Sequence, residues 1–205
     1  MTDKFRNKYR VASNRWQFWD YSAPAHYFIT ICIAGRQCIL GNVLNKKMRL
    51  SEYGRIVENE FQKIPQYHKR VVLDEWVVMP NHIHCIITLG DYDFDNGVSL
   101  FDNNNVAKIH EFSLLLPSFP LQNPTIEQIK QYRKQRRKMI IPKLVGKFQM
   151  QTSKQMNILR NTPGVKNWQS NYHDHVIRND DSYKRIRHYI LINPQKWGED
   201  TFNRQ

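Results

Sequence analysis

One stretch decides the fold of this chain, and it reads Trp76-Val77-Val78-Met79-Pro80-Asn81-His82-Ile83-His84-Cys85-Ile86-Ile87-Thr88-Leu89. Pro80 and Asn81 are turn-forming residues, and the runs on either side of them are apolar and β-branched. The stretch therefore predicts two antiparallel strands, over residues 71–79 and 82–89, that form a hairpin.

The second of these strands begins with two histidines separated by one isoleucine. Residues two apart on a strand share a face, so His82 and His84 point the same way and Ile83 points to the other side. Two imidazoles on a rigid strand can bind one divalent metal ion between them. A pair of hydrogen-bonded or solvated histidines on a half-buried sheet is the alternative, and the short pattern alone leaves both open.

The composition is that of a folded domain. The chain has 205 residues, of which 40% are hydrophobic and 12% aromatic, and this predicts a single domain over residues 1–205. Three cysteines, Cys32, Cys38 and Cys85, lack metal-ligand spacing, which favours reduced thiols. The N-terminus carries no apolar signal region, and no run of about 18 apolar residues could cross a membrane. We therefore expect a cytoplasmic protein that does not associate with membranes.

Positive charge is concentrated near the C-terminus. The net charge is +13, and residues 130–205 contain 17 Lys and Arg against 5 Asp and Glu. Such a density, interleaved with aromatic and amide side chains, favours a nucleic-acid partner over mere solubility.

The other expected elements follow from apolar periodicity, caps and proline positions. They are a strand over 26–33, a short strand at 38–40, a helix capped by Ser51 that ends at Pro65, a helix from Thr125 into the basic run 133–138, an interruption at Pro142, a helix over 143–159, an extended segment over 168–178 and a last helix over 182–192 that stops before Pro194.

Two regions lie outside this regular pattern. Residues 1–25 form a basic and aromatic arm, and residues 90–142 read as an insertion after the histidine strand, irregular over 90–124. Asp91, Asp93 and Asp95 invite comparison with a calcium loop, but the glycine required at its sixth position is absent.

The last predicted helix carries a second group of reactive side chains. Arg185, Tyr189 and Asn193 are spaced four apart and so lie on one helix face. A phenol between a cation and an amide suits attack on a phosphodiester. For any single tyrosine, however, packing of the ring on a sheet is the commoner role.

Three motifs in this order resemble one known family. They are Met79-Pro80-Asn81-His82-Ile83-His84, then Trp168-Gln169 with Tyr172-x-Asp174-His175-Val176-Ile177-Arg178, then Tyr189-Ile190-x-x-Asn193-Pro194-x-Lys196. The chain resembles the single-tyrosine His-hydrophobe-His (HUH) transposases of small bacterial insertion sequences, most closely the REP-associated tyrosine transposases. The resemblance covers residues 25–89 and 143–198. It implies an α+β fold: a ferredoxin-like antiparallel sheet with the histidines on a central strand and helices packed on one face.

The resemblance also implies roles for individual residues. His82 and His84 would bind Mg²⁺ or Mn²⁺ with Asn193 as third ligand, and Tyr189 would be the nucleophile. Tyr183 is a second candidate, but it lies about 240° around the helix from Tyr189, so both cannot face the metal.

The implied function is metal-dependent DNA nicking and strand transfer on single-stranded or hairpin DNA, through a 5′-phosphotyrosine intermediate. One tyrosine gives one cleavage per subunit, so transposition would need two subunits, as in a homodimer, or two sequential events. The candidate DNA contacts are Lys143, Lys147, Lys154, Arg178, Arg185 and Arg187, with Trp168 and Tyr172 as stacking platforms or core residues, and His175 as a structural or supporting residue of the site.

Two other classes stay open. One is a non-catalytic, domesticated DNA- or RNA-binding protein on the same scaffold. The other is a zinc hydrolase that uses His82 and His84, which would need further His or Asp ligands that the sequence does not identify.

Overall fold

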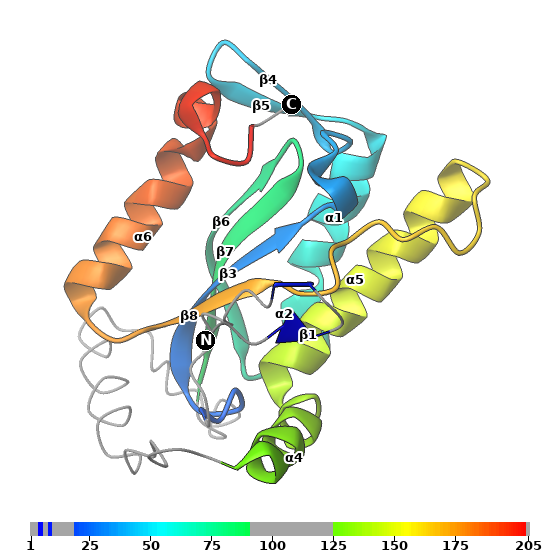
Figure 1. Ribbon diagram of the computed structural model, residues 1–205. Coiled ribbons are helices and arrows are strands. Elements are labelled where there is room, and N and C mark those ends of the chain that lie inside the picture. The colour runs from blue at the N-terminus through cyan, green and yellow to red at the C-terminus, as the bar shows by residue number, and fades with distance from the viewer. Residues whose placement is uncertain (1–3, 6–7, 10–18, 91–124, 204–205) are drawn as a thin grey trace.

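A four-stranded antiparallel sheet forms the centre of the molecule in this computed structural model, which describes residues 4–5, 8–9, 19–90 and 125–203 (Figure 1). The strand order is β6-β7-β3-β8, with bounds Val71–Met79 for β6, His82–Leu89 for β7, Ala25–Cys32 for β3 and His173–Ile177 for β8. The predicted hairpin is confirmed, since Met79 pairs with His82 across the Pro80-Asn81 turn. The histidine strand β7 is central, as predicted.

The two faces of the sheet are covered by different helices. Alternate β7 residues Ile83, Cys85 and Ile87 belong to the main core with residues of α1 (Glu52–Gln62) and α5 (Ile140–Leu159), and α2 (Ile64–Tyr67) adjoins them. Ile86, on the opposite face, packs with Ile190 of α6 (Asp180–Ile192). The predicted α+β class is confirmed, but α6 lies on the other face of the sheet from α1 and α5.

Local sequence explains where these helices begin. Ser51 caps α1 as predicted, accepting a hydrogen bond from the backbone of Gly54 at 3.1 Å. Asn179 caps α6 in the same way through Ser182, at 2.8 Å. The expected interruption at Pro142 is wrong, because Pro142 lies in the first turn of α5, where the backbone N–H has no partner within the helix.

The two helix ends predicted at other prolines are confirmed, since α1 ends at Gln62, before Pro65, and α6 ends at Ile192, before Pro194. Pro65 lies in the first turn of α2, directly after α1, and Pro194 opens a 3₁₀ helix, η3 (Asn193–Glu199). Proline at a first helical position is compatible with a new turn. As a result, η3 carries the C-terminal segment back toward the β6–β7 turn (Figure 1).

A small hairpin replaces the short strand expected at 38–40. Its strands are β4 (Gly41–Leu44) and β5 (Lys47–Leu50), and both turn residues, Asn45 and Lys46, have positive φ. Asn-Gly is the usual sequence signal for such a turn. Because Lys46 occupies the position where glycine is usual, the sequence did not indicate the turn. The Leu40 backbone bonds instead to Pro80 and Ser51, and 3₁₀ turn η1 (Ala34–Arg36) precedes it.

The arm and the insertion are partly described. β1 (Lys4–Phe5) pairs with β2 (Lys8–Tyr9), and Trp19 and Tyr21 are buried in the main core. Residues 125–142 are largely helical, with α4 (Ile126–Arg136) capped by Thr125. The region predicted to be irregular, including the aspartates of the calcium comparison, falls on residues 91–124 and lies outside the described residues. Within the described ranges, no helix is long and apolar enough to span a bilayer.

Candidate functional site

The two histidines lie side by side on β7, with ring centroids 4.4 Å apart. They share a face of the strand, as their spacing predicts. Their side chains are deeply buried: His82 is 0% exposed and His84 is 2% exposed. Burial excludes the solvated form of the alternative, whereas a structural pair of hydrogen-bonded histidines stays open, since His82 bonds to Asn81 and His84 to Thr30.

His82 is held in one tautomer by the turn residue before it. The Asn81 side-chain nitrogen donates to the carbonyls of Arg36, at 3.0 Å, and Phe202, at 2.8 Å. Its oxygen must therefore accept from Nδ1–H of His82, which lies 2.7 Å away. Nε2 of His82 keeps its lone pair, and no group of the described residues hydrogen-bonds to this buried atom. A neutral imidazole with its proton on Nδ1 is prepared to bind a metal through Nε2.

His84 connects the strand to the predicted nucleophile. Its Nδ1 lies 2.8 Å from the Thr30 hydroxyl on β3, and its Nε2 lies 3.1 Å from the Tyr189 hydroxyl. When the Nδ1 proton points at Thr30, the Tyr189 hydroxyl donates to Nε2. The structure thus brings together Tyr189, 39% exposed, and the two buried imidazoles.

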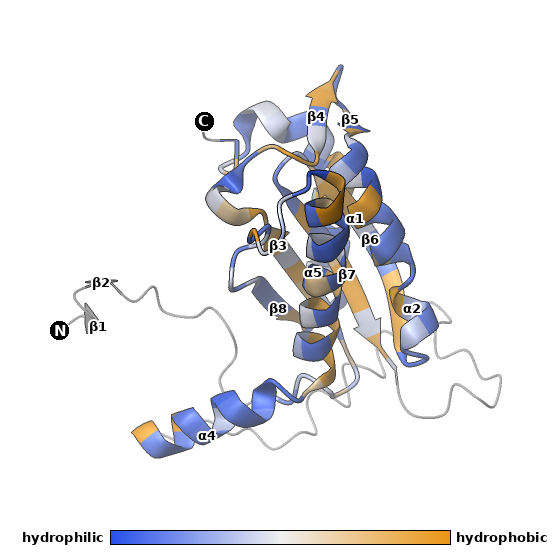
Figure 2. Cartoon of the chain, turned by 90° about the vertical axis from the view of Figure 1, so that its right-hand side faces the viewer, coloured by the Kyte–Doolittle hydropathy of each residue, from blue (hydrophilic) through white to orange (hydrophobic). Residues whose placement is uncertain are grey.

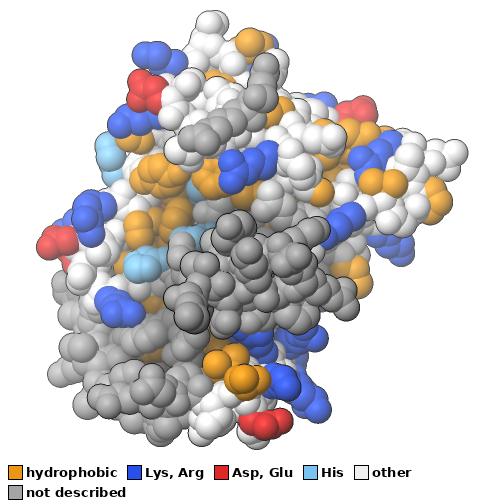
Figure 3. Space-filling view, in the orientation of Figure 1, with side chains coloured by type: hydrophobic (Ala, Val, Ile, Leu, Met, Phe, Trp, Pro, Cys, Tyr) orange, Lys and Arg blue, Asp and Glu red, His pale blue; other side chains and the backbone are white. Residues whose placement is uncertain are grey.

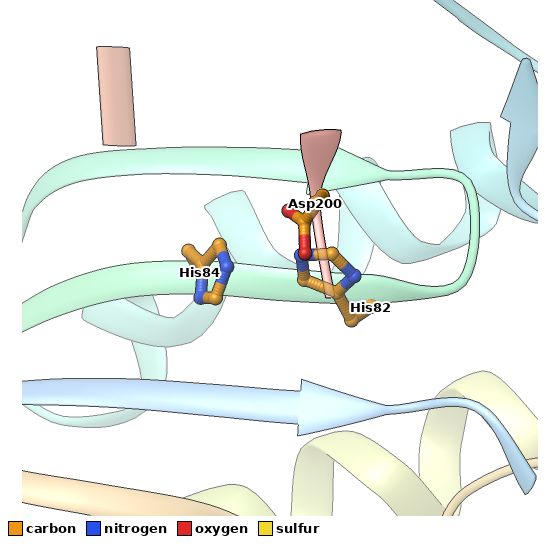
Figure 4. A group of neighbouring side chains, drawn as sticks. All are labelled: His82, His84 and Asp200. Carbon is orange, nitrogen blue, oxygen red and sulfur yellow. The ribbon is translucent and has the colours of Figure 1, made fainter. Parts of the chain in front are cut away.

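A carboxylate that sequence reasoning missed completes the cluster. Potential ligand atoms of Asp200, His82 and His84 all lie within 4.8 Å of one another. Figure 4 shows the Asp200 carboxylate pointing toward the two imidazoles from the segment that follows η3. No sequence pattern marks Asp200, because it follows the irregular 3₁₀ turn rather than a periodic element.

The segment after η3 is fixed against the histidines by several contacts. The centroid of the Phe202 ring lies 4.6 Å from that of the His82 ring. The Arg36 guanidinium lies over the Phe202 ring, 4.9 Å from its centroid. The backbone N–H of Phe202 donates to the Asp200 carboxylate at 2.8 Å. Together with the bond from Asn81, these contacts orient Asp200 toward the site.

Burial controls the protonation of the site. It lowers the pKa of His82 to about 3, with a smaller effect from the nearby Arg36 charge. Burial, His82 and His173 together hold the pKa of His84 well below its ordinary value. Both imidazoles are therefore neutral near pH 7 and able to act as ligands.

The environment of Tyr189 favours the protonated phenol. Burial and the Asp200 carboxylate raise the pKa of Tyr189, and a hydrogen bond from Asn193 acts in the opposite direction. The Asn193 side chain is 2% exposed, and its Oδ1 has no partner among the described residues. An amide oxygen is a suitable ligand for Mg²⁺ or Mn²⁺, so its role as third ligand stays a prediction.

The donor set fits a divalent cation. Two neutral imidazole nitrogens and one carboxylate could hold it, and His82 Nε2 and Asn193 Oδ1 are buried polar atoms without a described partner. Nε2 of His84 has one lone pair, so the Tyr189 hydroxyl and a cation compete for it.

The predicted DNA-contact residues divide between the two faces of the sheet. Arg185 and Arg187 lie on α6, on the histidine side, and Arg178 lies between β8 and α6. Lys143, Lys147 and Lys154 lie on α5, on the opposite side, where Lys143 and Lys147 line a cavity of about 220 Å³.

The remaining predicted residues have mainly structural surroundings. Trp168 is 3% exposed and its indole donates to Thr152 at 2.8 Å, so its role is core packing rather than base stacking. Tyr172 is half-buried against the same core. His175 is exposed on β8, and His173 is the β8 histidine whose charge acts on His84. Figure 3 shows histidine and hydrophobic side chains together on this face of the molecule.

Comparisons with solved structures found two chains that this chain is similar to. The chain is similar to a REP-associated tyrosine transposase bound to a REP hairpin, with 20% identity and a TM-score of 0.48, covering 90% of this chain and 74% of that one. It is also similar to a candidate transposase of Deinococcus radiodurans, with 12% identity and a TM-score of 0.41, covering 88% and 96%.

In sequence, the chain is 29% identical over 188 residues to an uncharacterized protein of Haemophilus influenzae, covering 92% of this chain and 90% of that protein. No model of a protein family matches the sequence.

Proposed function

We propose that this protein is a metal-dependent DNA-nicking and strand-transfer enzyme of the transposase type. The observation that carries the proposal is the position of Tyr189, whose hydroxyl lies 3.1 Å from a buried neutral imidazole. A phenol beside two imidazoles and a carboxylate has the components of a phosphodiester-cleaving site. The similar solved structure of a REP-associated tyrosine transposase bound to a REP hairpin suggests hairpin or single-stranded DNA as the substrate.

His82, His84 and Asp200 would hold the cation, with Asn193 as a further oxygen ligand. Mg²⁺ or Mn²⁺ would act there as a Lewis acid that stabilises the charge developing on the phosphate. The carboxylate and amide oxygens are ligands that suit Mg²⁺ and Mn²⁺.

Tyr189 would lose its hydroxyl proton and attack the scissile phosphate. A bond forms between its oxygen and phosphorus, the bond to the 3′-oxygen breaks, and that oxygen takes up a proton. The products are a 5′-phosphotyrosine link and a free 3′-hydroxyl, which can later attack the link and transfer the strand. Asn193 supports the phenolate through the hydrogen bond that opposes the raised pKa of Tyr189. Arg185, four residues before Tyr189, would offset phosphate charge.

The face of the sheet on which each basic residue lies decides which DNA contact we propose for it. We propose that Arg178, Arg185 and Arg187 hold the strand being cut, because they lie on the side of the sheet that bears Tyr189. Lys143, Lys147 and Lys154 could contact only DNA that extends around to α5. A homodimer stays a prediction, which the mass of the protein in solution would test.

The test is the covalent adduct. Wild-type protein, Mn²⁺ and a labelled hairpin with an unpaired flank should give a protein–DNA adduct on denaturing gels, and Tyr189→Phe should abolish it. Binding of Mn²⁺, measured by calorimetry, should persist or strengthen in Tyr189→Phe, because the hydroxyl that competes for His84 Nε2 is gone. An adduct that survives the substitution would remove Tyr189 from the proposed role.

A zinc hydrolase is the second candidate, and Asp200 favours it. The sequence alone did not identify a third ligand, whereas two histidines and one carboxylate form a common catalytic zinc set. Zinc at one equivalent with hydrolysis but no adduct would support this candidate. If the protein bound no metal and formed no adduct, the result would support the non-catalytic binding protein.

A further inference from the structure

Helix α4 projects from the domain and is anchored along only part of its surface. Figure 2 shows it extending from the body of the molecule, hydrophilic over most of its length. The Tyr132 hydroxyl donates to the carbonyl of Trp19 at 2.8 Å, and the Arg136 guanidinium lies 6.0 Å from the Tyr21 ring. Thr125 begins the helix with a full capping box, so its first turn is well formed without a tertiary partner.

The anchored side of α4 and its exposed cations occupy separate arcs of the helix. At 100° per residue, the half-buried residues Ile129, Tyr132 and Arg136 fall within an arc of about 60°. Four exposed residues, Lys130, Arg133, Lys134 and Arg137, fall within a separate arc of about 100°, whose centre lies about 120° around the helix from that of the first arc. Docking of the helix therefore turns these four cations toward solvent.

Charge on this segment is strongly one-sided. Residues 126–138 contain six Lys or Arg and a single acidic residue, Glu127. No carboxylate in the described part of the chain forms an ion pair with the four solvent-facing cations. Figure 3 shows Lys and Arg side chains gathered at the lower end of the molecule, where α4 lies. A polyanion is the partner that complements this face.

The position of α4 separates it from the catalytic candidates. Its C-terminal end lies beside residues 19–22, just before β3 begins at Ala25, and Ala25 pairs with Leu89 at the far end of β7 from His82. Seven residues of strand from His82 to Leu89 span about 23 Å. That length corresponds to about 7 base pairs of duplex. A nucleic acid that reaches both regions must extend at least that far.

We propose that α4 binds the phosphate backbone of the double-stranded part of the DNA substrate, while the Tyr189 site acts on the unpaired strand. The choice of substrate rests on the proposed function, but binding by α4 does not require the site to be active. From Lys130 to Arg137 the helix extends about 10 Å, a length over which duplex DNA carries about six phosphate charges. Four cations on one face can neutralise most of them.

The experiment uses full-length protein with Tyr189→Phe, so that no covalent adduct forms. Fluorescence anisotropy measures the affinity for a hairpin with a 12-base-pair stem and an unpaired flank, between 50 and 200 mM salt. Against this parent, one variant carries Lys130→Gln, Arg133→Gln, Lys134→Gln and Arg137→Gln. The matched control exchanges Lys and Arg at the same positions and so keeps the charge. Glutamine is a good helix former, and circular dichroism checks that the fold is retained.

We expect the slope of log affinity against log salt to become shallower by about 3 to 4 in the glutamine variant. Over this salt range the parent should lose about 100-fold more affinity than the variant. The charge-preserving control should keep the slope of the parent. On a hairpin whose stem is about 5 base pairs, parent and variant should have similar slopes.

Three results would overturn the inference. They are a slope change below 1, an equal loss in the charge-preserving control, or the full slope change on the unpaired flank alone, which would make α4 a single-strand contact. Failure of the proposed function would appear in a different measurement. Protein with wild-type Tyr189 would then form no adduct, and the salt slopes described above would be unchanged.

Discussion

On one face of β7 the buried side chains are Ile83, Cys85, Ile87 and Leu89, and on the other they include His82 and His84. All eight residues of the strand are buried, so exposure does not distinguish the two faces. The first face packs hydrocarbon against α1 and α5. The second buries two imidazoles, one of which has a ring nitrogen without a partner in the described structure.

This contrast favours a ligand-binding role for the histidine face over a purely stabilising one. Burying a polar atom without a hydrogen bond costs about 1–3 kcal/mol, and a hydrocarbon side chain would avoid this cost. Asn81 and Thr30 hold the two rings by Nδ1, which leaves Nε2 of His82 without a described partner and Nε2 of His84 beside the Tyr189 hydroxyl. Sites that sacrifice stability in this way are typical of function.

The largest effect on activity should come from removing both imidazoles of the histidine face. We expect His82→Ala with His84→Ala to lower the rate of DNA cleavage by about 1,000-fold or more, because the groups that hold the charge-stabilising cation are lost. Calorimetric Mn²⁺ binding should be lost as well. The salt-dependent affinity for hairpin DNA should change little, since the basic residues remain.

Cys85→Ala is the matched control from the opposite face of the same strand. It should lower the free energy of unfolding without altering Mn²⁺ affinity, because Cys85 faces the main core. If the double alanine variant still bound Mn²⁺ with wild-type affinity, the histidine face would be structural.

The fold could be predicted where one residue pattern sufficed. The turn formers Pro80 and Asn81 and the apolar, β-branched runs beside them identified the hairpin, which the structure confirms. Proline was misleading at Pro142, since its effect depends on whether the position is in the first turn or the interior of a helix. The β4–β5 turn was missed because Lys46 adopts a positive φ that glycine usually provides.

The site was predictable only in its sequence-adjacent parts. The histidine pair followed from spacing, whereas the meeting of Tyr189 with His84 came from a family resemblance rather than from periodicity. Thr30 faces His84 through the β3–β7 register, which a single sequence does not encode. Asp200 reaches the cluster through a 3₁₀ turn without a hydrophobic period, so no pattern could have indicated it.

The two faces of β7 should also differ in how they make folding stability depend on pH. Burial lowers the pKa of His82 to about 3 in the folded protein, against about 6.5 in the unfolded chain. The unfolded state therefore binds more protons between these values, and stability is lost as pH falls from about 6.5 toward 3. For His82 alone the slope approaches about 1.4 kcal/mol per pH unit, and His84 adds in the same direction.

Urea denaturation of metal-free protein at pH 7, 6, 5 and 4 measures this dependence. The variant with His82→Gln and His84→Gln is the reference, because its carboxylates titrate as in the parent. The parent should lose more stability than the variant as pH falls. Parallel curves would mean that the two imidazoles are not held neutral by the fold.

The smallest effect should come from the other tyrosine of α6. The Tyr183 hydroxyl donates to the Asp74 carboxylate, and its ring lies 5.0 Å from that of His26, so it packs along the sheet away from the histidine pair. Burial and the bond to Asp74 raise the pKa of Tyr183, which disfavours it as a nucleophile.

We expect Tyr183→Phe to lower the free energy of unfolding by about 1 kcal/mol, the usual contribution of one hydrogen bond, and to leave adduct formation intact. Denaturing gels beside Tyr189→Phe measure the second outcome under identical conditions. A folded Tyr183→Phe protein without adduct would transfer the nucleophile to Tyr183. The histidine pair would then have to act at a distance from the phenol it contacts in this structure, and the contrast between the two faces of β7 would no longer explain the chemistry.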